Sequence, residues 1–342
     1  MPIYPNIYQT LLPGPIVELR GYLAACGLRG RLYAYLNYNG PTGTARDELA
    51  EGMLALALER AGALTPGQTI VEAVSGPFAT ALTLAGLTAG HPVTLVMPED
   101  APAMRQESLL RLGAQIIHTP AQAGPAGARA LAKATAAEKG WYYMDWLNND
   151  DNPTYHRRVT GPALVRSIAR EGSSIVDSIV IGVGSGGTIT GVGETVKAWT
   201  NDVRIVAVEP YESQALSSGL TGSHGIPDIG FGLVPGNYNS YVVDNIAAVT
   251  TSDAVRAAQR VLRTDAIPAS PTCRCRPSRS GPAYRKRQKP FGTGRVQRTP
   301  EHTIKRKREG IHDKRHDDRS HHAPSGQIHH PAGAGQPVPA HL

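Results

Sequence analysis

The sequence has few of the features that mark a membrane, secreted or disulfide-rich protein. Only three cysteines occur among 342 residues, too few for a disulfide framework, which favours a reducing compartment. No stretch approaches the roughly 18 uninterrupted apolar residues that span a bilayer. The first residues also lack the basic and apolar regions of a signal peptide. We therefore expect a cytoplasmic globular protein with no membrane partner.

Charge is scarce and unevenly placed. Charged residues make up 18% of the chain, and the formal net charge is +7. Residues 271–342 contain 16 Lys and Arg against 5 Asp and Glu, and the remaining 19 and 23 leave the first 270 residues at −4. The basic segment has no apolar period and cannot bury enough surface to offset chain entropy. We predict a disordered basic tail over residues 271–342.

This tail differs in kind from the rest of the chain. It holds 8 of the 12 histidines, and its Arg, His, Pro, Gly and Ser content is what an out-of-frame reading of GC-rich DNA would give. We hypothesise a frameshift near Ser270. Cys273-x-Cys275 is not a zinc-site spacing, so no metal site is expected. Basic runs such as Lys305–Arg308 attract nucleic acid non-specifically, and nothing indicates a dedicated nucleic-acid role.

Residues 1–270 alternate buried apolar segments with helical patterns, which is typical of an α/β fold with a mostly parallel sheet. The predicted strands, rich in β-branched residues, are Thr69–Val74, Pro92–Met97, Ala114–Thr119, Ser178–Val183 and Val203–Val208. The predicted helices are Glu48–Ala61, Pro77–Ala89, Met104–Leu112, Ala126–Lys139, Tyr155–Glu171 and Ile189–Trp199. A polar turn at Asn148–Pro153 is a candidate lobe boundary.

A glycine-rich turn joins the fourth strand to the last helix. It reads Gly184-Ser185-Gly186-Gly187-Thr188. Glycines permit close backbone approach, the loop N–H groups and the helix N-terminus attract an anion, and the two hydroxyls add donors. We predict a phosphate site here. A tight turn with only a structural role is the alternative.

The same residues fit a second kind of phosphate site. Gly182, Gly184 and Gly187 form the GxGxxG fingerprint of dinucleotide binding, and the next predicted strand ends in Glu209, which could accept a ribose hydroxyl. A nicotinamide-dependent dehydrogenase is therefore an alternative to a binder of a simple phosphate ester.

The order of several motifs favours the phosphate ester. In sequence order they are Leu12–Leu19 (LPGPIVEL), Pro41–Asp47 (PTGTARD), Glu72–Ala79 (EAVSGPFA), Asn152-Pro153, His156, Thr160–Pro162, the GSGGTITG run, Val208–Pro210 and Ile229–Pro235. Over residues 8–268 this arrangement resembles the cysteine synthase group of fold type II pyridoxal-phosphate enzymes, the tryptophan synthase β-like family.

The resemblance implies a two-lobed fold with the cofactor between the lobes. Residues 1–40 and 150–270 would form the larger, cofactor-binding lobe and residues 41–149 the smaller one. Gly184 through Thr188 would hold the cofactor phosphate, and Ser75 and Gly76 would contact the amino-acid substrate. The typical family reaction is β-replacement, in which sulfide replaces the activated side chain of O-acetylserine to give cysteine. Members are commonly homodimers.

Three departures from the family pattern argue against this reaction. Arg46 stands where the family has its Schiff-base lysine, and a guanidinium has no free amine to form an imine. The first lysine in the chain is Lys133. Pro77 replaces the asparagine of the substrate loop, which removes its polar side chain. The family's C-terminal Ser-Ser-Gly turn is missing after Ser270.

We therefore expect no intact catalytic residue, and weak, non-covalent binding of pyridoxal phosphate. The alternatives are a non-catalytic paralogue that binds phosphate or a protein partner, and the dehydrogenase. For side chains outside the motifs we expect structural roles. His156 should start a helix, Cys26 should be a small buried residue, and Tyr33, Tyr35 and Tyr38 should share one face of a strand.

Overall fold

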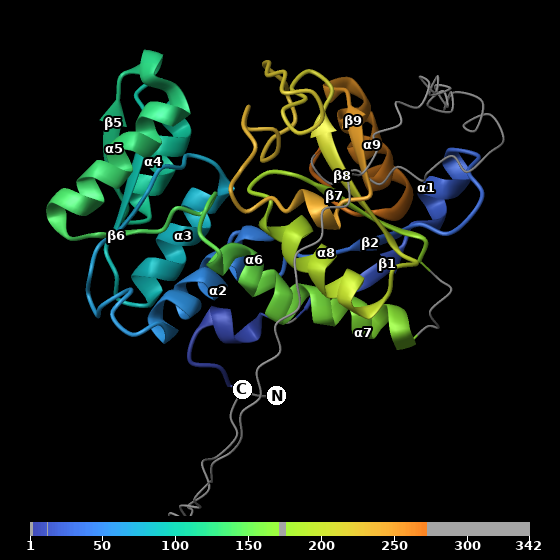
Figure 1. Cartoon of the computed structure of the whole chain (residues 1–342), viewed down its shortest axis with the longest axis horizontal. Coiled ribbons are helices and arrows are strands. Elements are labelled where there is room, and N and C mark those ends of the chain that lie inside the picture. The colour runs from blue at the N-terminus through green and yellow to red at the C-terminus, as the bar shows by residue number, and fades with distance from the viewer. Residues whose placement is uncertain (1–2, 12, 171–175, 272–342) are drawn as a thin grey trace, which may run out of the picture. The chain divides into compact units, whose positions relative to one another are not determined.

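The computed structural model describes residues 3–11, 13–170 and 176–271. They belong to one compact unit that spans Met1–Arg279 (Figure 1). Apart from Pro271, the predicted tail, with Cys273 and Cys275, lies outside the described residues. The end of the predicted helix Tyr155–Glu171 also lies outside them.

A four-stranded parallel sheet is formed by residues between 70 and 143. Its strands lie in the order β5-β4-β3-β6, and their bounds are β3 (Ile70–Glu72), β4 (Val93–Pro98), β5 (Gln115–Thr119) and β6 (Tyr142–Tyr143). All of β3 and most of β4 are buried, as expected of a parallel sheet covered on both faces. The covering helices are α2 (Arg46–Glu59), α3 (Pro77–Thr88), α4 (Ala103–Arg111) and α5 (Gly124–Lys139) (Figure 1).

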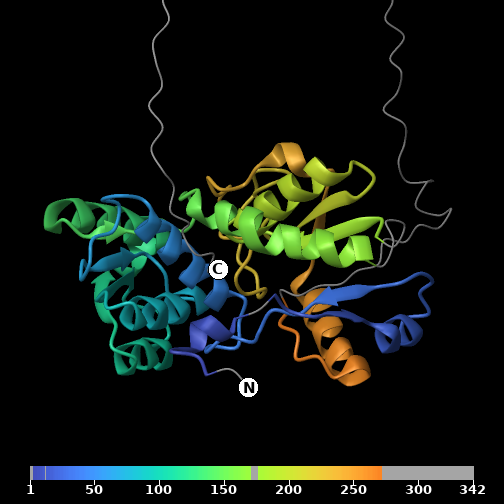
Figure 2. The same cartoon turned by 90° about the horizontal axis from the view of Figure 1, so that it is seen from below.

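A second parallel sheet has the order β7-β8-β9. Its strands are β7 (Ser178–Gly182), β8 (Arg204–Pro210) and β9 (Asn245–Val249), and its helices are α6 (Asp151–Tyr155), α7 (Gly161–Arg170), α8 (Gly187–Trp199) and α9 (Thr251–Asp265). In Figure 2, α7 and α8 lie on one side of this region, and α9 lies on the other. Val192, Val196 and Ile205 are among the buried residues between α8 and the sheet.

An antiparallel pair of short strands lies near α9. It consists of β1 (Ile16–Glu18) and β2 (Tyr33–Tyr35), with α1 (Arg20–Ala25) between them. Two expectations were wrong here. Tyr38 lies beyond β2 and is 40% exposed, because the strand ends at Tyr35. Cys26 is only partly buried, because it lies at the end of α1, where Arg260 of α9 reaches its sulfur at 3.1 Å.

The five predicted strands and the α/β class are confirmed. The predicted helix from Tyr155 is interrupted instead of continuous, because residues His156–Thr160 form a π-helical turn between α6 and α7. The short 3-10 turns are Ile7–Thr10, Ala121–Ala123 and Ser240–Val242. The four-stranded sheet lies inside the range predicted for the smaller lobe, and the division into lobes stays a prediction.

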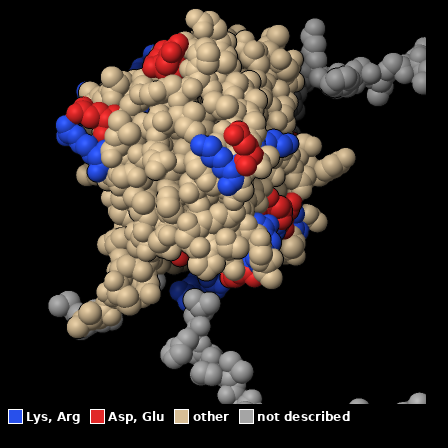
Figure 3. All heavy atoms as spheres, turned by 90° about the vertical axis from the view of Figure 1, so that its left-hand side faces the viewer, with Lys and Arg blue, Asp and Glu red and all other residues tan. Residues whose placement is uncertain are grey.

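Surface charge is dispersed on the face shown in Figure 3. Lysine and arginine side chains lie scattered there, and several are next to acidic ones. That face has no basic stripe of the kind that binds nucleic acid.

No helix in the described ranges is both long and apolar enough to cross a membrane. Within the same ranges, no three His, Cys, Asp or Glu side chains are grouped to hold a metal ion.

Candidate functional site

The predicted phosphate loop lies between β7 and α8. Gly184 to Gly187 are buried, and Gly186 has φ +81°, a conformation that favours glycine. A Cβ on Gly184 would collide with the carbonyl oxygen of Asp228, and a Cβ on Gly187 would collide with the side chain of Asn152. Glycine is therefore required by close packing as well as by backbone conformation.

The backbone of this loop offers amide groups as hydrogen-bond donors for a ligand. The N–H groups of residues 184–188 make no hydrogen bond to any part of the chain that the structure describes. Buried amide groups are normally paired, and such groups at the start of a helix bind anions. The 13-residue α8 adds the positive end of its dipole. The geometry suits a phosphate group.

Two side chains behind the loop hold its hydroxyls in place. The Nδ2 of Asn152 donates to Ser185 Oγ at 3.0 Å and to the Trp146 carbonyl at 2.7 Å. Thr188 Oγ1 lies 3.0 Å from Nε2 of His156, whose Nδ1 lies 2.9 Å from Thr160 Oγ1. His156 thus supports the loop, but from the first residue of the π-helical turn and not from a helix start.

His156 is uncharged at neutral pH. Burial, and to a smaller extent the positive charge of Arg46, lower its pKa to about 3. A neutral imidazole keeps one nitrogen as donor and one as acceptor, which matches its two hydroxyl partners. The charge of Arg46 therefore acts on a side chain that supports the loop.

Arg46 is the first residue of α2 and is partly buried. Its guanidinium carbon lies 5.6 Å from the centre of the Trp146 ring, an arrangement typical of cation–π contact. The turn before it is fixed by buried Asp47, whose Oδ2 accepts from the amide and hydroxyl of Thr42 at 3.0 and 2.8 Å. The arginine is therefore held at the site by a rigid turn.

No lysine in the described part of the chain takes its place. Lys133 is exposed on α5, and Lys139 lies over the Trp141 ring, 4.6 Å from its centre. Lys197 pairs with Asp244 at 2.8 Å. An amine that could form an imine beside the phosphate loop is therefore missing from these residues.

The predicted substrate loop begins α3. Gly76 is the N-cap and Pro77 the first helical residue, as expected of a proline in this position. Phe78 is buried and stacks on Trp146, with ring centres 4.6 Å apart and planes at 13°. Trp146 thus links the substrate loop to Arg46.

A hollow of about 220 Å³ lies in front of this loop. It is lined by Thr42, Thr44, Gly76, Pro77, Thr80 and Arg105. Gly76 and Pro77 of the predicted substrate loop line the hollow, but Ser75 does not.

Sequence reasoning missed three residues at this site: Trp146, Arg105 and Asp228. Asp228 Oδ1 lies 3.3 Å from the position that a Cβ on Gly76 would occupy, and its carbonyl packs on Gly184. It therefore contacts both predicted loops. The only available signal was its place directly before the Ile229–Pro235 motif.

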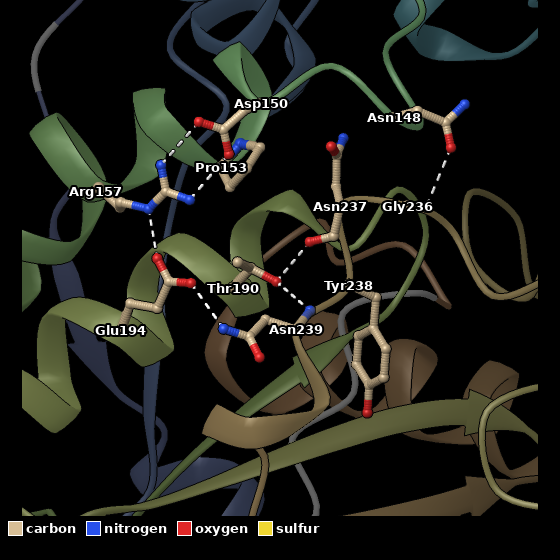
Figure 4. A pocket seen from close by; sticks show the side chains of 10 residues that line it. All are labelled: Asn148, Asp150, Pro153, Arg157, Thr190, Glu194, Gly236, Asn237, Tyr238 and Asn239. Atoms are coloured by element: carbon tan, nitrogen blue, oxygen red, sulfur yellow. Dashed lines mark hydrogen bonds and ion pairs between the residues drawn. The ribbon is translucent and has the colours of Figure 1, made fainter.

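A larger hollow of about 430 Å³ lies elsewhere (Figure 4). Its charged groups pair with one another, since Arg157 contacts Asp150 at 3.0 Å and also Glu194. Thr190 Oγ1 donates to the carbonyl oxygen of Asn237 and accepts from the amide of Asn239 (Figure 4). These groups tie α6 and α8 to the 236–239 loop, and the hollow contains no predicted site residue.

Glu209, the candidate ribose acceptor, is 1% exposed. Its Oε2 accepts from the Leu216 amide at 2.8 Å, and its Oε1 accepts from the Ser217 hydroxyl. Both oxygens already accept hydrogen bonds from the 213–218 segment. The buried carboxylate is therefore not available to accept a hydrogen bond from a ribose hydroxyl.

Comparison with known proteins gives a consistent result. Residues 7–276 match the family model described as pyridoxal-phosphate dependent enzyme. The chain is 34% identical over 262 residues to a cysteine synthase of Staphylococcus aureus, covering 77% of this chain and 83% of the relative. The structure is similar to that of a cysteine synthase of Entamoeba histolytica, with TM-score 0.72, 31% identity and coverage of 79% and 80%. It is also similar to O-ureido-L-serine synthase, with TM-score 0.72, 27% identity and coverage of 79% and 84%.

Proposed function

Because the chain belongs to the pyridoxal-phosphate dependent enzyme family, in the cysteine synthase group, we propose that it is a member without the catalytic lysine. It binds pyridoxal phosphate reversibly through Gly184–Thr188 and does not sustain the β-replacement of an activated serine by sulfide. The observation that carries this proposal is Arg46, which begins α2 and lies over the ring of Trp146. The Trp146 carbonyl accepts from the same Asn152 amide group that holds Ser185 of the loop.

The phosphate end of the cofactor fits the site. The unpaired amides of residues 184–188, the start of α8 and the Ser185 hydroxyl provide neutral donors for a dianion. Hydrogen bonds to a charged group contribute about 1.5–3 kcal/mol each. Association itself costs about 4–15 kcal/mol, so a few such bonds support only weak binding.

The aldehyde end does not fit. Arginine stays protonated in proteins and carries no free amine, and Lys133, Lys139 and Lys197 are engaged or exposed elsewhere. The dehydrogenase alternative is weaker still, because both oxygens of Glu209 are occupied.

Replacing Arg46 by lysine tests the proposal directly. The wild-type protein, mixed with pyridoxal phosphate, should give no borohydride-reducible absorbance at about 400–430 nm, the region of a lysine-bound cofactor. Arg46→Lys should gain this band, because its amine can lose a proton when desolvated. Cysteine formation from O-acetylserine and sulfide is then measured on both proteins.

Arg46→Gln is the matched control, since it removes the charge and supplies no amine. It should bind the cofactor more weakly than wild type and stay colourless after borohydride treatment. Covalent pyridoxyl found by mass spectrometry on wild-type residues 1–270 would overturn the proposal.

A further inference from the structure

An aromatic side chain lies against the phosphate loop. Cε2 of Phe231 is 3.4 Å from the position that a Cβ on Gly184 would occupy, which is van der Waals contact. The Phe231 ring also packs against Trp146 in an edge-to-face arrangement, with ring centres 5.8 Å apart and planes at 66°. Since Trp146 stacks on Phe78, a row of three rings runs from the phosphate loop to the start of α3.

The ring on which Phe231 packs is fixed in place. Trp146 is 5% exposed, and its amide donates to the carboxyl group of Glu72 at 2.9 Å. Its carbonyl accepts from Asn152 at 2.7 Å and from Asn237 at 2.9 Å. Because packed interiors leave little space for movement, the Phe231 ring can leave its position only toward solvent.

The backbone that carries Phe231 is fixed as well. The Gly230 amide donates at 3.1 Å to the carbonyl of Val183, the residue before the phosphate loop. The Gly230 carbonyl lies 2.8 Å from Nε2 of His224. Gly230 has φ +63°, and a Cβ on it would collide with Pro210, so this close approach requires glycine. A rearrangement here is therefore a rotation of the Phe231 side chain and not a movement of the backbone.

Phe231 differs from the other groups around the loop in its exposure. The remaining atoms nearest to the Cβ positions of the loop glycines belong to Asp228, Tyr238 and Asn152. Asn152 is fully buried and the other two residues are half-buried, whereas Phe231 is 39% exposed. When the loop amides bind the phosphate end of an ester, the rest of the ester has to extend toward solvent, and on these sides of the loop that direction passes Phe231.

We propose that Phe231 is a specificity-determining residue of the phosphate loop. Its ring occupies space beside Gly184 that the ring of pyridoxal phosphate needs, so the loop favours a small phosphate ester over one with an aromatic ring. Binding of the cofactor requires the Phe231 side chain to rotate away from Gly184 and Trp146. The inference rests on the proposed function, because it concerns the same loop and the same cofactor.

The size of the ligand and not its charge sets this preference. A small phosphate ester and pyridoxal phosphate present the same dianion to the amides of residues 184–188, so the hydrogen bonds of the loop are common to both. Phe231 is apolar and does not distinguish charges. What separates the two ligands is the aromatic contact that the larger one displaces, and such contacts stabilise beyond the area that they bury.

Two ligands of equal charge measure the preference. Methyl phosphate is a small ester. Pyridoxine phosphate has the ring of the cofactor with an alcohol in place of the aldehyde, so exposed lysines such as Lys133 cannot capture it. Isothermal titration at about pH 8, where phosphate monoesters are dianions, gives both dissociation constants. Phe231→Ala should bind pyridoxine phosphate about 2- to 10-fold more tightly than the wild type, the range of one aromatic pair, and methyl phosphate equally well.

Tyr241→Ala is the matched control, since it removes an aromatic ring that is 98% exposed. It should leave both affinities unchanged. Phe231→Leu keeps an apolar cover on Trp146 and should show a smaller gain in the same direction, which provides the test if Phe231→Ala does not fold. A Phe231 that only covers Trp146 would lower Tm when replaced and leave the ratio of the two affinities unchanged. An unchanged ratio, or weaker binding of pyridoxine phosphate, would overturn the inference.

Titration with pyridoxal phosphate keeps the two proposals apart. Binding of pyridoxal phosphate by Phe231→Ala and not by the wild type would count against the proposed function alone, because the natural chain would then bind no cofactor. Equal affinity of the two proteins for it would count against this inference alone. If none of the three ligands binds any of the proteins, the loop is not a phosphate site and both proposals fail.

Discussion

Glu72 is a fully buried carboxyl that connects β3 to the site. Its Oε1 accepts from the amide of Ala73 at 2.7 Å, and its Oε2 accepts from the amide of Trp146 at 2.9 Å. Burial raises the pKa of Glu72 to about 8, although both amides act in the opposite direction. The position of Trp146, and with it the ring stack at the substrate loop, therefore depends on a carboxyl that titrates near neutral pH.

This pKa predicts a pH dependence of stability. The pKa of Glu72 is higher in the folded than in the unfolded protein, so protonated Glu72 favours the folded state. This stabilisation is complete below pH 4.5, the ordinary pKa, and is lost as pH rises through about 8. His156 has the opposite effect, because its pKa is lower in the folded protein: it destabilises the fold as pH falls from 6.5 toward 3. Between pH 6.5 and 8, Glu72 is the group expected to dominate, with a slope of at most about 1.4 kcal/mol per pH unit.

Urea unfolding at several pH values measures this slope. The wild-type free energy of unfolding should fall from pH 6.5 to 8, whereas Glu72→Gln should be flat in the same window. The variant will be less stable at low pH, because its amide group cannot accept from both backbone amides. Parallel curves for the two proteins would show that Glu72 does not titrate in this range.

Among single residues, those of the candidate site that lie in contiguous motifs could be predicted from the sequence. Gly184–Thr188 carries its conformation and its chemistry in five adjacent residues, and Arg46 is recognised from its neighbours. Asp228 and Arg105 could not be found in this way. Asp228 has a positive φ and lies near Gly76, and Arg105 lines the hollow in front of the same loop, and none of these properties is encoded in local composition.

Among the elements, α1 depends on a residue far away in the chain. This six-residue helix has no side-chain cap of its own at Leu19. Instead the last residue of α9, Asp265, accepts from the amides of Gly21 and Tyr22 at 2.9 and 2.8 Å. A carboxylate at a helix start satisfies free amides and interacts favourably with the dipole. The contact ties the N-terminal hairpin to α9.

Removing this cap should be costly. Asp265→Ala should lower the free energy of unfolding by about 1 kcal/mol, within the range of about 0.5–2 for lost caps. Glu107→Ala, which breaks the exposed pair with Arg111 on α4, is the control and should cost only about 0.3–0.5 kcal/mol. A cost for Asp265→Ala no larger than that of the control would mean that solvent caps α1 equally well.

Element prediction succeeded where one physical signal dominated. Segments rich in β-branched residues gave five of the seven strands of the two parallel sheets, and β6 and β9 were missed. The helical pattern from Tyr155 to Arg170 continues across the π-helical turn, so its period could not reveal the interruption. β9, Asn245–Val249, was missed because it is short and mostly exposed, which leaves no run of buried residues to detect.

Across the whole described unit, the two parallel sheets are buried to different extents. β3 is buried throughout, and five of the six residues of β4 are buried. In the second sheet, Val180 of β7 is 38% exposed and Ile246 of β9 is 37% exposed. The apolar sequence of β7 predicts a buried strand, and the described residues cover it only in part.

Hydrogen exchange should reflect this difference. Opening free energies are highest where backbone hydrogen bonds lie beneath packed apolar side chains, so the amides of β3 and β4 should exchange slowest. The amides of β9 should exchange faster, because one edge of β9 has no neighbouring strand among the described residues and its side chains are mostly exposed. Mass spectrometry of deuterium uptake on the intact protein measures both. If β9 proves as protected as β4, its exposed side chains and open edge do not weaken the second sheet, and something outside the described residues covers it.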